Sequence, residues 1–466
     1  MSTRHRTHPT RQEIGSLNDE TSHLDSRITD EPHLVSWQKT TLAKRLNPIQ
    51  PPIGRLPREV LSEIFKALVL PSAARPHTHI RVFAFVPEEF KYIFVLGAVS
   101  SLWREVVFST PSLWTYFRWS PEDLETETGS PSILRYYLKN SGTLSIHLEL
   151  HFFGVTPEDG SLFHPSVDEE LLENMSKIKT LLLHQPPAIW DGCLSKLTTL
   201  VNLVLDREDL PSLSHQGDIL DCCRDLVELS LTNLWESDIE ELDSTLVQSW
   251  CGGSGLVFKQ LEMFEWESPR DFEFAWDWVD LFLNEVHMPA LRTLILSKED
   301  MGRASERYFL DRHAPTISTL RLELFDNISK ATYAKFFALD SPLECVTLLN
   351  YGKEVLTSVA AMLTADNITN PSRRHPLPAP RLKSLALTGR SMELLGQTKL
   401  KPSQYESLIS MLEQRLAVGG GTFHLEFSYL VPDWTDGVQE RLISLVKRGV
   451  KLDIVEDGYR VGWLES

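Results

Sequence analysis

The chain carries the stretch LPREVLSEIF at residues 56–65 and, further on, the stretch VSSLWREVVFSTPSLW at residues 99–114. In the first stretch Pro57 suits the first turn of a helix, because the N–H that proline lacks would have no helical partner there. Glu59 adds a negative charge at the positive end of the helix dipole. The apolar residues that follow recur at helical spacing and form one broad stripe: Val60, Leu61, Ile64, Phe65 and Leu68. The stretch therefore predicts a short amphipathic helix.

The second stretch predicts another short helix. Val99, Trp103, Val106 and Val107 fall on one helical face. The pair Thr110-Pro111 ends this helix, because a residue that precedes proline avoids the α conformation. About thirty residues, 69–97, separate the two helices, and LPSAARPHTHIR at residues 70–81 is predicted to be a loop.

Together these segments resemble the F-box, in the arrangement typical of F-box proteins of mushroom-forming fungi. In that family the two helices dock onto the small Skp-type adaptor of SCF ubiquitin ligases. The resemblance implies adaptor contacts by Leu56, Pro57, Glu59, Val60, Leu61, Ile64, Phe65, Val99, Trp103 and Trp114. The alternative is that both segments are core helices of some other α domain. The matching order of unlike residues, beyond the hydrophobic period alone, favours the F-box.

Length, charge and cysteine usage narrow the class of protein. At 466 residues the chain is long enough for two or three domains. The formal net charge of −18 argues against nonspecific binding to nucleic acid, which needs clustered Lys and Arg. No apolar run predicts a membrane span, and the polar N-terminus does not look like a secretory signal. Five scattered cysteines without CxxC spacing predict free thiols, and hence an intracellular protein of the cytoplasm, the nucleus or both.

The first part of the chain divides into two predicted regions. Residues 1–30 are polar, lack a helical stripe and are expected to be disordered. Residues 31–119 are expected to form the F-box-like helical domain, with a short helix over residues 32–46 in front of it.

After residue 119 a short pattern recurs: an apolar residue, two others, an apolar residue, one other, an apolar residue. It occurs at Ile178/Leu181/Leu183, Leu200/Leu203/Leu205, Leu226/Leu229/Leu231, Leu261/Phe264/Trp266, Leu291/Leu294/Leu296, Ile317/Leu320/Leu322, Leu343/Val346/Leu348 and Leu382/Leu385/Leu387. The spacing of the units lies in and just above the period of leucine-rich repeats. Each unit therefore predicts one strand of a parallel sheet.

Helical patterns alternate with these units. They occur at residues 133–138, 274–286, 355–363, 405–416 and 438–446, and further strands are expected at residues 144–150, 423–427 and 451–455. We therefore expect an α+β multidomain protein, in which a small all-α F-box precedes an irregular α/β leucine-rich-repeat solenoid over residues 120–466, with a C-terminal cap. The alternative is another α/β domain with a parallel sheet, for example a doubly wound one, against which the absence of a phosphate-binding glycine motif argues.

No motif in the chain predicts catalysis. The histidines, including His147, His151 and His313, show no metal-ligand spacing, so solvated or core roles are expected. The glycine runs lack the Lys-Ser/Thr of a phosphate loop, and there is no GxSxG elbow. An enzyme on an α/β fold is therefore the weakest interpretation, and neither a cofactor nor a metal is expected.

The resemblance implies a substrate-recognition subunit of an SCF-type cullin-RING ubiquitin ligase. The F-box would bind the Skp-type adaptor and so join the cullin complex, while the repeat domain would hold a protein target. Tentative target contacts flank or alternate with the inward leucines: Arg292, Lys298, Glu299, Arg321, Glu323 and Lys383. The alternative function is a non-catalytic repeat scaffold that binds proteins without assembling a ligase.

Overall fold

A computed structural model gives the fold of the chain. It describes residues 56–70, 89–119, 130–152, 171–186, 194, 196–206, 224–232, 256–267, 276–297, 304–323, 333, 335–350, 354–364, 377–389, 398–399, 402–418, 422–428, 430–431, 435–448, 451–456 and 459–462. The chain divides into two compact units, Met1–Leu148 and Glu149–Ser466. The predictions for residues 1–30 and for the helix over residues 32–46 lie outside the described residues.

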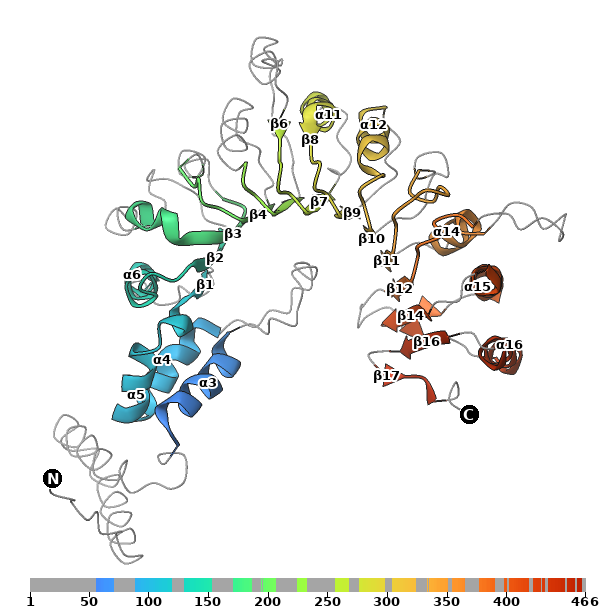
Figure 1. Ribbon diagram of the computed structural model, residues 1–466. Coiled ribbons are helices and arrows are strands. Elements are labelled where there is room, and N and C mark those ends of the chain that lie inside the picture. Colours follow the sequence, from blue (N-terminus) through green and yellow to red (C-terminus); the bar gives the residue numbers. More distant parts are fainter. Residues whose placement is uncertain are drawn as a thin grey trace, which may run out of the picture. The chain divides into compact units, whose positions relative to one another are not determined.

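The first unit is mostly helical (Figure 1). It contains α3 (Arg58–Val69), α4 (Glu89–Val99), α5 (Ser101–Phe108), a 3-10 helix (Pro111–Trp114), β1 (Tyr116–Trp119), α6 (Ser130–Asn140) and the first residues of β2 (Ile146–His151). The helices predicted from residues 56–65 and 133–138 are thus confirmed as α3 and α6. Pro57 lies one residue before α3, and its carbonyl accepts the first helical hydrogen bond, from Leu61.

One prediction about this unit was wrong. Val99 does not share a helix with Trp103, because it is the last residue of α4, a helix that the sequence analysis did not expect. Ser100 separates the two helices in an extended conformation, and its Oγ accepts a hydrogen bond from the backbone N–H of Trp103 at 3.1 Å. A serine in this position satisfies a free N–H at the start of a helix, so a new helix, α5, begins at Ser101.

An aromatic cluster forms the core of the first unit. Trp114 is fully buried, and its indole N–H donates to the carbonyl of Val107 at 3.0 Å. Its ring stacks on Phe108 at 5.2 Å and meets Tyr137 edge-on, also at 5.2 Å. Burial raises the pKa of Tyr137. On the surface, Arg58 and Glu105 form an ion pair at 2.7 Å that ties α3 to α5.

The second unit is built on a large, mostly parallel sheet. Its strands, in spatial order after β2, are β3 (Ile178–His184), β4 (Asn202–Asp206), β5 (Glu228–Thr232), β7 (Met263–Glu267), β9 (Thr293–Ser297), β10 (Thr319–Glu323), β11 (Cys345–Leu349), β12 (Ser384–Thr388), β14 (Thr422–Ser428), β16 (Lys451–Glu456) and β17 (Tyr459–Arg460). The spatial order follows the order in the chain. Only the last of these pairings, β16 with β17, is antiparallel.

Two small parallel pairs lie outside this sheet: β6 (Leu256–Val257) with β8 (Val286–His287), and β13 (Thr398–Lys399) with β15 (Leu430–Val431).

Every one of the eight apolar units predicted from the sequence contributes a strand. The last two apolar residues of each unit lie in the strand, as Leu294, Leu320 and Val346 do at matching positions of β9, β10 and β11. All the residues of these units are buried except Leu205, which is half-buried. The fold is therefore mixed α/β with a large, mostly parallel sheet.

The described helices of the second unit lie along one side of the sheet (Figure 1). They are α11 (Trp276–Glu285), α12 (Ala304–His313), α14 (Val355–Met362), α15 (Pro402–Val418) and α16 (Asp436–Lys447). Four of them were predicted from the sequence, and α12 was not. Because side chains alternate along a strand, the leucines of each unit turn to one face and the residues between them to the opposite face. Among the described residues, no helix combines the length and apolar character needed to cross a membrane.

Candidate functional site

The first unit exposes an apolar stripe along α3. Helix α3 carries two parallel apolar rows, each with a repeat of four residues. Leu61, Phe65 and Val69 are buried in the unit. Val60, Ile64 and Leu68 are 43%, 37% and 63% exposed. The exposed row lies about 100° around the helix from the buried one, so α3 leaves an apolar flank in contact with water.

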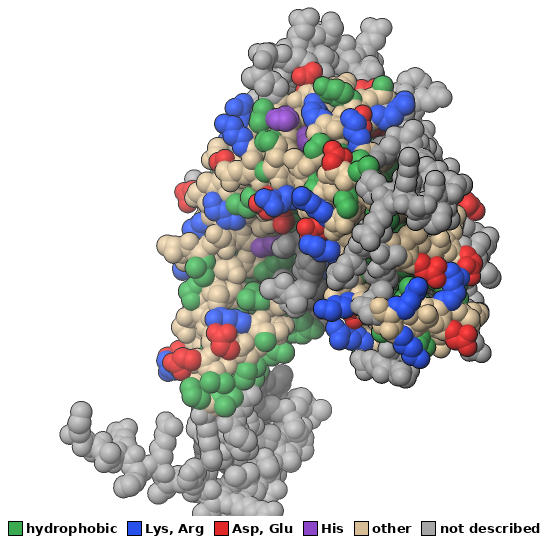
Figure 2. Space-filling view, turned by 45° about the vertical axis from the view of Figure 1, so that its right-hand side comes forward, with side chains coloured by type: hydrophobic (Ala, Val, Ile, Leu, Met, Phe, Trp, Pro, Cys, Tyr) green, Lys and Arg blue, Asp and Glu red, His purple; other side chains and the backbone are tan. Residues whose placement is uncertain are grey.

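Helix α4, which contacts α3, repeats this arrangement. Ile93 and Leu96 are buried, whereas Tyr92, Val95 and Val99 are 42%, 57% and 47% exposed. Figure 2 shows hydrophobic side chains gathered on the surface of this part of the molecule. We call the six exposed residues Val60, Ile64, Leu68, Tyr92, Val95 and Val99 the outer apolar face. Isolated exposed apolar residues are ordinary on proteins, but two neighbouring helices with such rows make this a candidate interaction surface.

The structure divides the predicted adaptor residues into two groups. Pro57, Glu59, Val60, Ile64 and Val99 are exposed. Leu61, Phe65 and Trp114 are fully buried, and Leu56 and Trp103 are half-buried. Phe65 and Trp103 pack with their ring centroids 4.9 Å apart, inside the unit. The buried group therefore builds the helical unit, and the exposed group supplies its surface.

In the second unit, a row of polar side chains runs across the face of the sheet that lies opposite the leucines. Each of these residues stands at the carboxyl end of its strand. In the register of the sheet, His184, Asp206 and Thr232 are level with one another, and so are Glu267, Ser297 and Glu323. We call the buried polar residues His151, His184, Asp206, Thr232, Glu267, Ser297 and Glu323 the end row.

The end row begins with a cluster of imidazoles and carboxylates. The rings of His151 and His184 stack, with centroids 4.1 Å apart and planes within 7°. Nε2 of His151 lies 2.8 Å from Oε1 of Glu149, and Nδ1 of His184 lies 2.9 Å from Oδ2 of Asp206. One ligand atom each from Glu149, His151 and His184 lies within 4.8 Å of the other two, so these residues could hold a metal ion.

The predicted target contacts do not converge on one site. Arg321 and Glu323 are buried on the end-row face, 3.6 Å apart as an ion pair. Arg292 and Lys383 are exposed, each one residue before its strand, and Lys383 pairs with Glu344 at 2.9 Å. Arg292 and Lys383 lie level with each other at the starts of their strands, whereas Arg321 lies in the middle of β10 and Glu323 at its end, about 10 Å and about 16 Å further along the strand direction.

Lys298 and Glu299, the other two predicted target contacts, lie outside the described residues.

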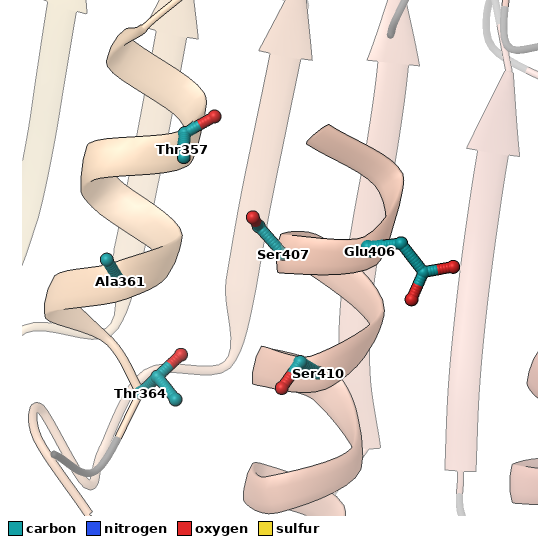
Figure 3. A pocket seen from close by; sticks show the side chains of 6 residues that line it. All are labelled: Thr357, Ala361, Thr364, Glu406, Ser407 and Ser410. Atoms are coloured by element: carbon teal, nitrogen blue, oxygen red, sulfur yellow. The ribbon is translucent and has the colours of Figure 1, made fainter. Parts of the chain in front are cut away.

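A shallow groove also opens on the helical side of the second unit, between α14 and α15 (Figure 3). Its volume is about 510 Å³, and it is lined by Thr357, Ala361, Thr364, Glu406, Ser407 and Ser410. Small hydroxyl-bearing and alanine side chains leave this space because they do not fill the gap between the helices. Glu406 is engaged by Arg441 of α16 at 2.6 Å. The groove offers no set of converging catalytic groups.

Comparison with protein-family models and with curated proteins found no match to this chain. Sequence spacing missed the cluster around His184, because its members come from different strands. The signal was present in the repeat itself, since His184 and Asp206 each directly follow the last leucine of a unit.

Proposed function

We propose that this chain is the substrate-recognition subunit of an SCF-type ubiquitin ligase. Its first unit would act as an F-box that binds the Skp-type adaptor, and its second unit would hold a protein target near the cullin complex. The chain would contribute proximity and no chemistry of its own.

The observation that carries this proposal is the outer apolar face on α3 and α4. A short helical unit with a complete aromatic core has no internal use for exposed residues such as Ile64, Leu68 and Val95. A partner that covers them gains roughly 25 cal/mol for each Å² of apolar surface removed from water. The sequence of α3 resembles the F-box helix that binds the adaptor, so the resemblance and the exposed stripe favour the same partner.

For the second unit we propose an irregular leucine-rich-repeat solenoid. Support comes from strands that follow one another through the sheet in chain order, with the described helices along one side of it. A doubly wound sheet reverses its strand order and carries helices on both faces. Repeat proteins of this kind bind their partners through the sheet face and its edges, and here Arg292 and Lys383 are exposed just before the strands β9 and β12 begin.

The adaptor test changes the outer apolar face without touching the core. Ile64→Asp combined with Leu68→Asp puts two charges on exposed positions of α3. We expect co-precipitation of the full chain with a purified Skp-type adaptor to fall at least about tenfold, because interface centres tolerate no unpaired charge. The double variant Leu56→Ala/Pro57→Ala, at the start of α3, should also weaken binding.

The matched control is Leu339→Asp, at a leucine of the second unit that is 53% exposed. It introduces one such charge at another exposed apolar residue and should leave adaptor binding unchanged. Undiminished adaptor binding by the Ile64/Leu68 variant would remove the F-box assignment. A wild-type chain that captures protein targets and binds no adaptor would instead support the repeat scaffold.

A further inference from the structure

We propose that Glu149, His151 and His184 form a binding site for a divalent transition-metal ion at the start of the end row, with Asp206 orienting His184. This inference concerns the second unit alone and does not depend on the proposed function.

The positions of the three residues follow from the strands. Glu149 and His151 are two residues apart on β2, so their side chains point to the same face of the sheet. The backbone N–H of Phe152 donates to the carbonyl of His184 at 2.9 Å, which places the ends of β2 and β3 side by side. His184 pairs in register with Asp206 on β4. Three consecutive strands thus bring four polar side chains to one place.

The residue types suit a borderline metal ion. Zn²⁺ takes imidazole nitrogen at about 2.0–2.1 Å and carboxylate oxygen at about 2.0–2.2 Å, and three protein ligands with one open position are common. Two imidazoles and one carboxylate are also used by other divalent transition metals, whereas Mg²⁺ and Ca²⁺ prefer oxygen ligands alone. The pair between Nδ1 of His184 and Asp206, at 2.9 Å, is the kind of contact that orients a metal-binding imidazole.

The spacing requires only local rearrangement. Ligand atoms on a tetrahedral zinc ion lie about 3.4 Å apart, and the three atoms here lie within 4.8 Å of one another. Even the widest pair would have to close by no more than about 1.4 Å, which two side chains can share. Because the rings of His151 and His184 are parallel, one ring must turn about its Cβ–Cγ bond so that both nitrogens face the ion.

The experiment measures zinc binding to the full chain after removal of metal with a chelator. Zn²⁺ is titrated into the wild type and into the His151→Gln/His184→Gln variant, and bound metal per chain is determined by equilibrium dialysis. We expect the wild type to bind one Zn²⁺ that the variant lacks at the same free concentration. Asp206→Asn should weaken binding at this site about 10–100-fold, the usual effect of losing a residue that orients a ligand. Mg²⁺ should not compete.

The matched control is His424→Gln. His424 makes a similar contact, with Nδ1 2.9 Å from Oδ2 of Asp453, at the other end of the sheet. The His424→Gln variant should bind the same number of Zn²⁺ ions per chain as the wild type. If far-UV circular dichroism shows that the double histidine variant is unfolded, Glu149→Gln serves in its place, because this residue is the most exposed of the three ligands and the change is isosteric.

Co²⁺ gives a second measurement, since its visible absorption reports ligand number and geometry. Loss of the Co²⁺ bands in Glu149→Gln, with retention in His424→Gln, would support the site. Equal zinc stoichiometry and affinity in the wild type and in the folded site variants would overturn the proposal. An equal loss in His424→Gln would overturn it as well.

Discussion

Replacing Leu320 by alanine should destabilise the second unit strongly. Leu320 is completely buried as the second residue of β10, between Leu294 of β9 and Val346 of β11, which are buried to the same degree. The change removes three carbon atoms, worth about 0.8 kcal/mol each in transfer free energy, or about 2.4 kcal/mol in all. The two neighbouring strands hold the site open, so a cavity remains and raises the total to about 3–5 kcal/mol.

Leu339→Ala is the control for this prediction, because it makes the same chemical change at an exposed leucine and should cost less than about 0.5 kcal/mol. Thermal unfolding of the full chain, followed by circular dichroism, should show a transition about 5–15 °C lower for Leu320→Ala than for Leu339→Ala. Equal midpoints for the two variants would refute the reasoning, since they would mean that the repeated leucines do not form the core.

Two further predictions concern buried polar groups. His313 is buried, with its Nδ1–H donated to the carbonyl of Phe309 and its Nε2 accepting from the N–H of Met288, and burial lowers its pKa to about 4. This neutral histidine contributes stability that is complete above pH 6.5 and is lost as the pH falls toward 4, by up to about 3 kcal/mol. His313→Gln should flatten this part of the stability profile in unfolding experiments between pH 7 and 4; an unchanged slope would contradict the assignment. Arg415 donates to the buried carbonyl of Ala379 at 3.0 Å, so Arg415→Met should cost about 1–3 kcal/mol in urea unfolding, and a neutral effect would show that this contact does not stabilise the fold.

Much of the sheet could be predicted from the sequence because one physical rule repeats. A strand with one face against the helices needs apolar residues at alternate positions. A third apolar residue, in the turn just before the strand, is buried as well. Leu291, Leu294 and Leu296 satisfy this rule, and so do the corresponding residues of the other units. Because this rule depends only on residues close together in the sequence, it predicts each strand. The helical patterns between the strands predict that the strands run parallel.

The helix boundaries in the first unit could not be predicted in the same way. Helix α4 is apolar over most of its length and has no clear amphipathic pattern, so periodicity does not reveal it. The role of Ser100 as the first residue before α5 depends on backbone conformation, which a helical pattern through Val99 and Trp103 cannot detect. The exposure of Ile64 beside the buried Phe65 likewise depends on which face of α3 meets α5.

The site residues were harder to predict for a different reason, which also explains how such a sheet can acquire function. Fold and chemistry occupy alternate positions of the same strand: Leu183 is buried against the core, while His184 belongs to the opposite face. A change at the second kind of position leaves the apolar pattern intact, so those positions can vary without loss of the fold. Register then places them next to residues of the neighbouring strand, as His184 lies next to Asp206. The polar residues that meet on this face therefore come from neighbouring strands that are far apart in the sequence. A search for motifs within one segment does not find such a group as a whole.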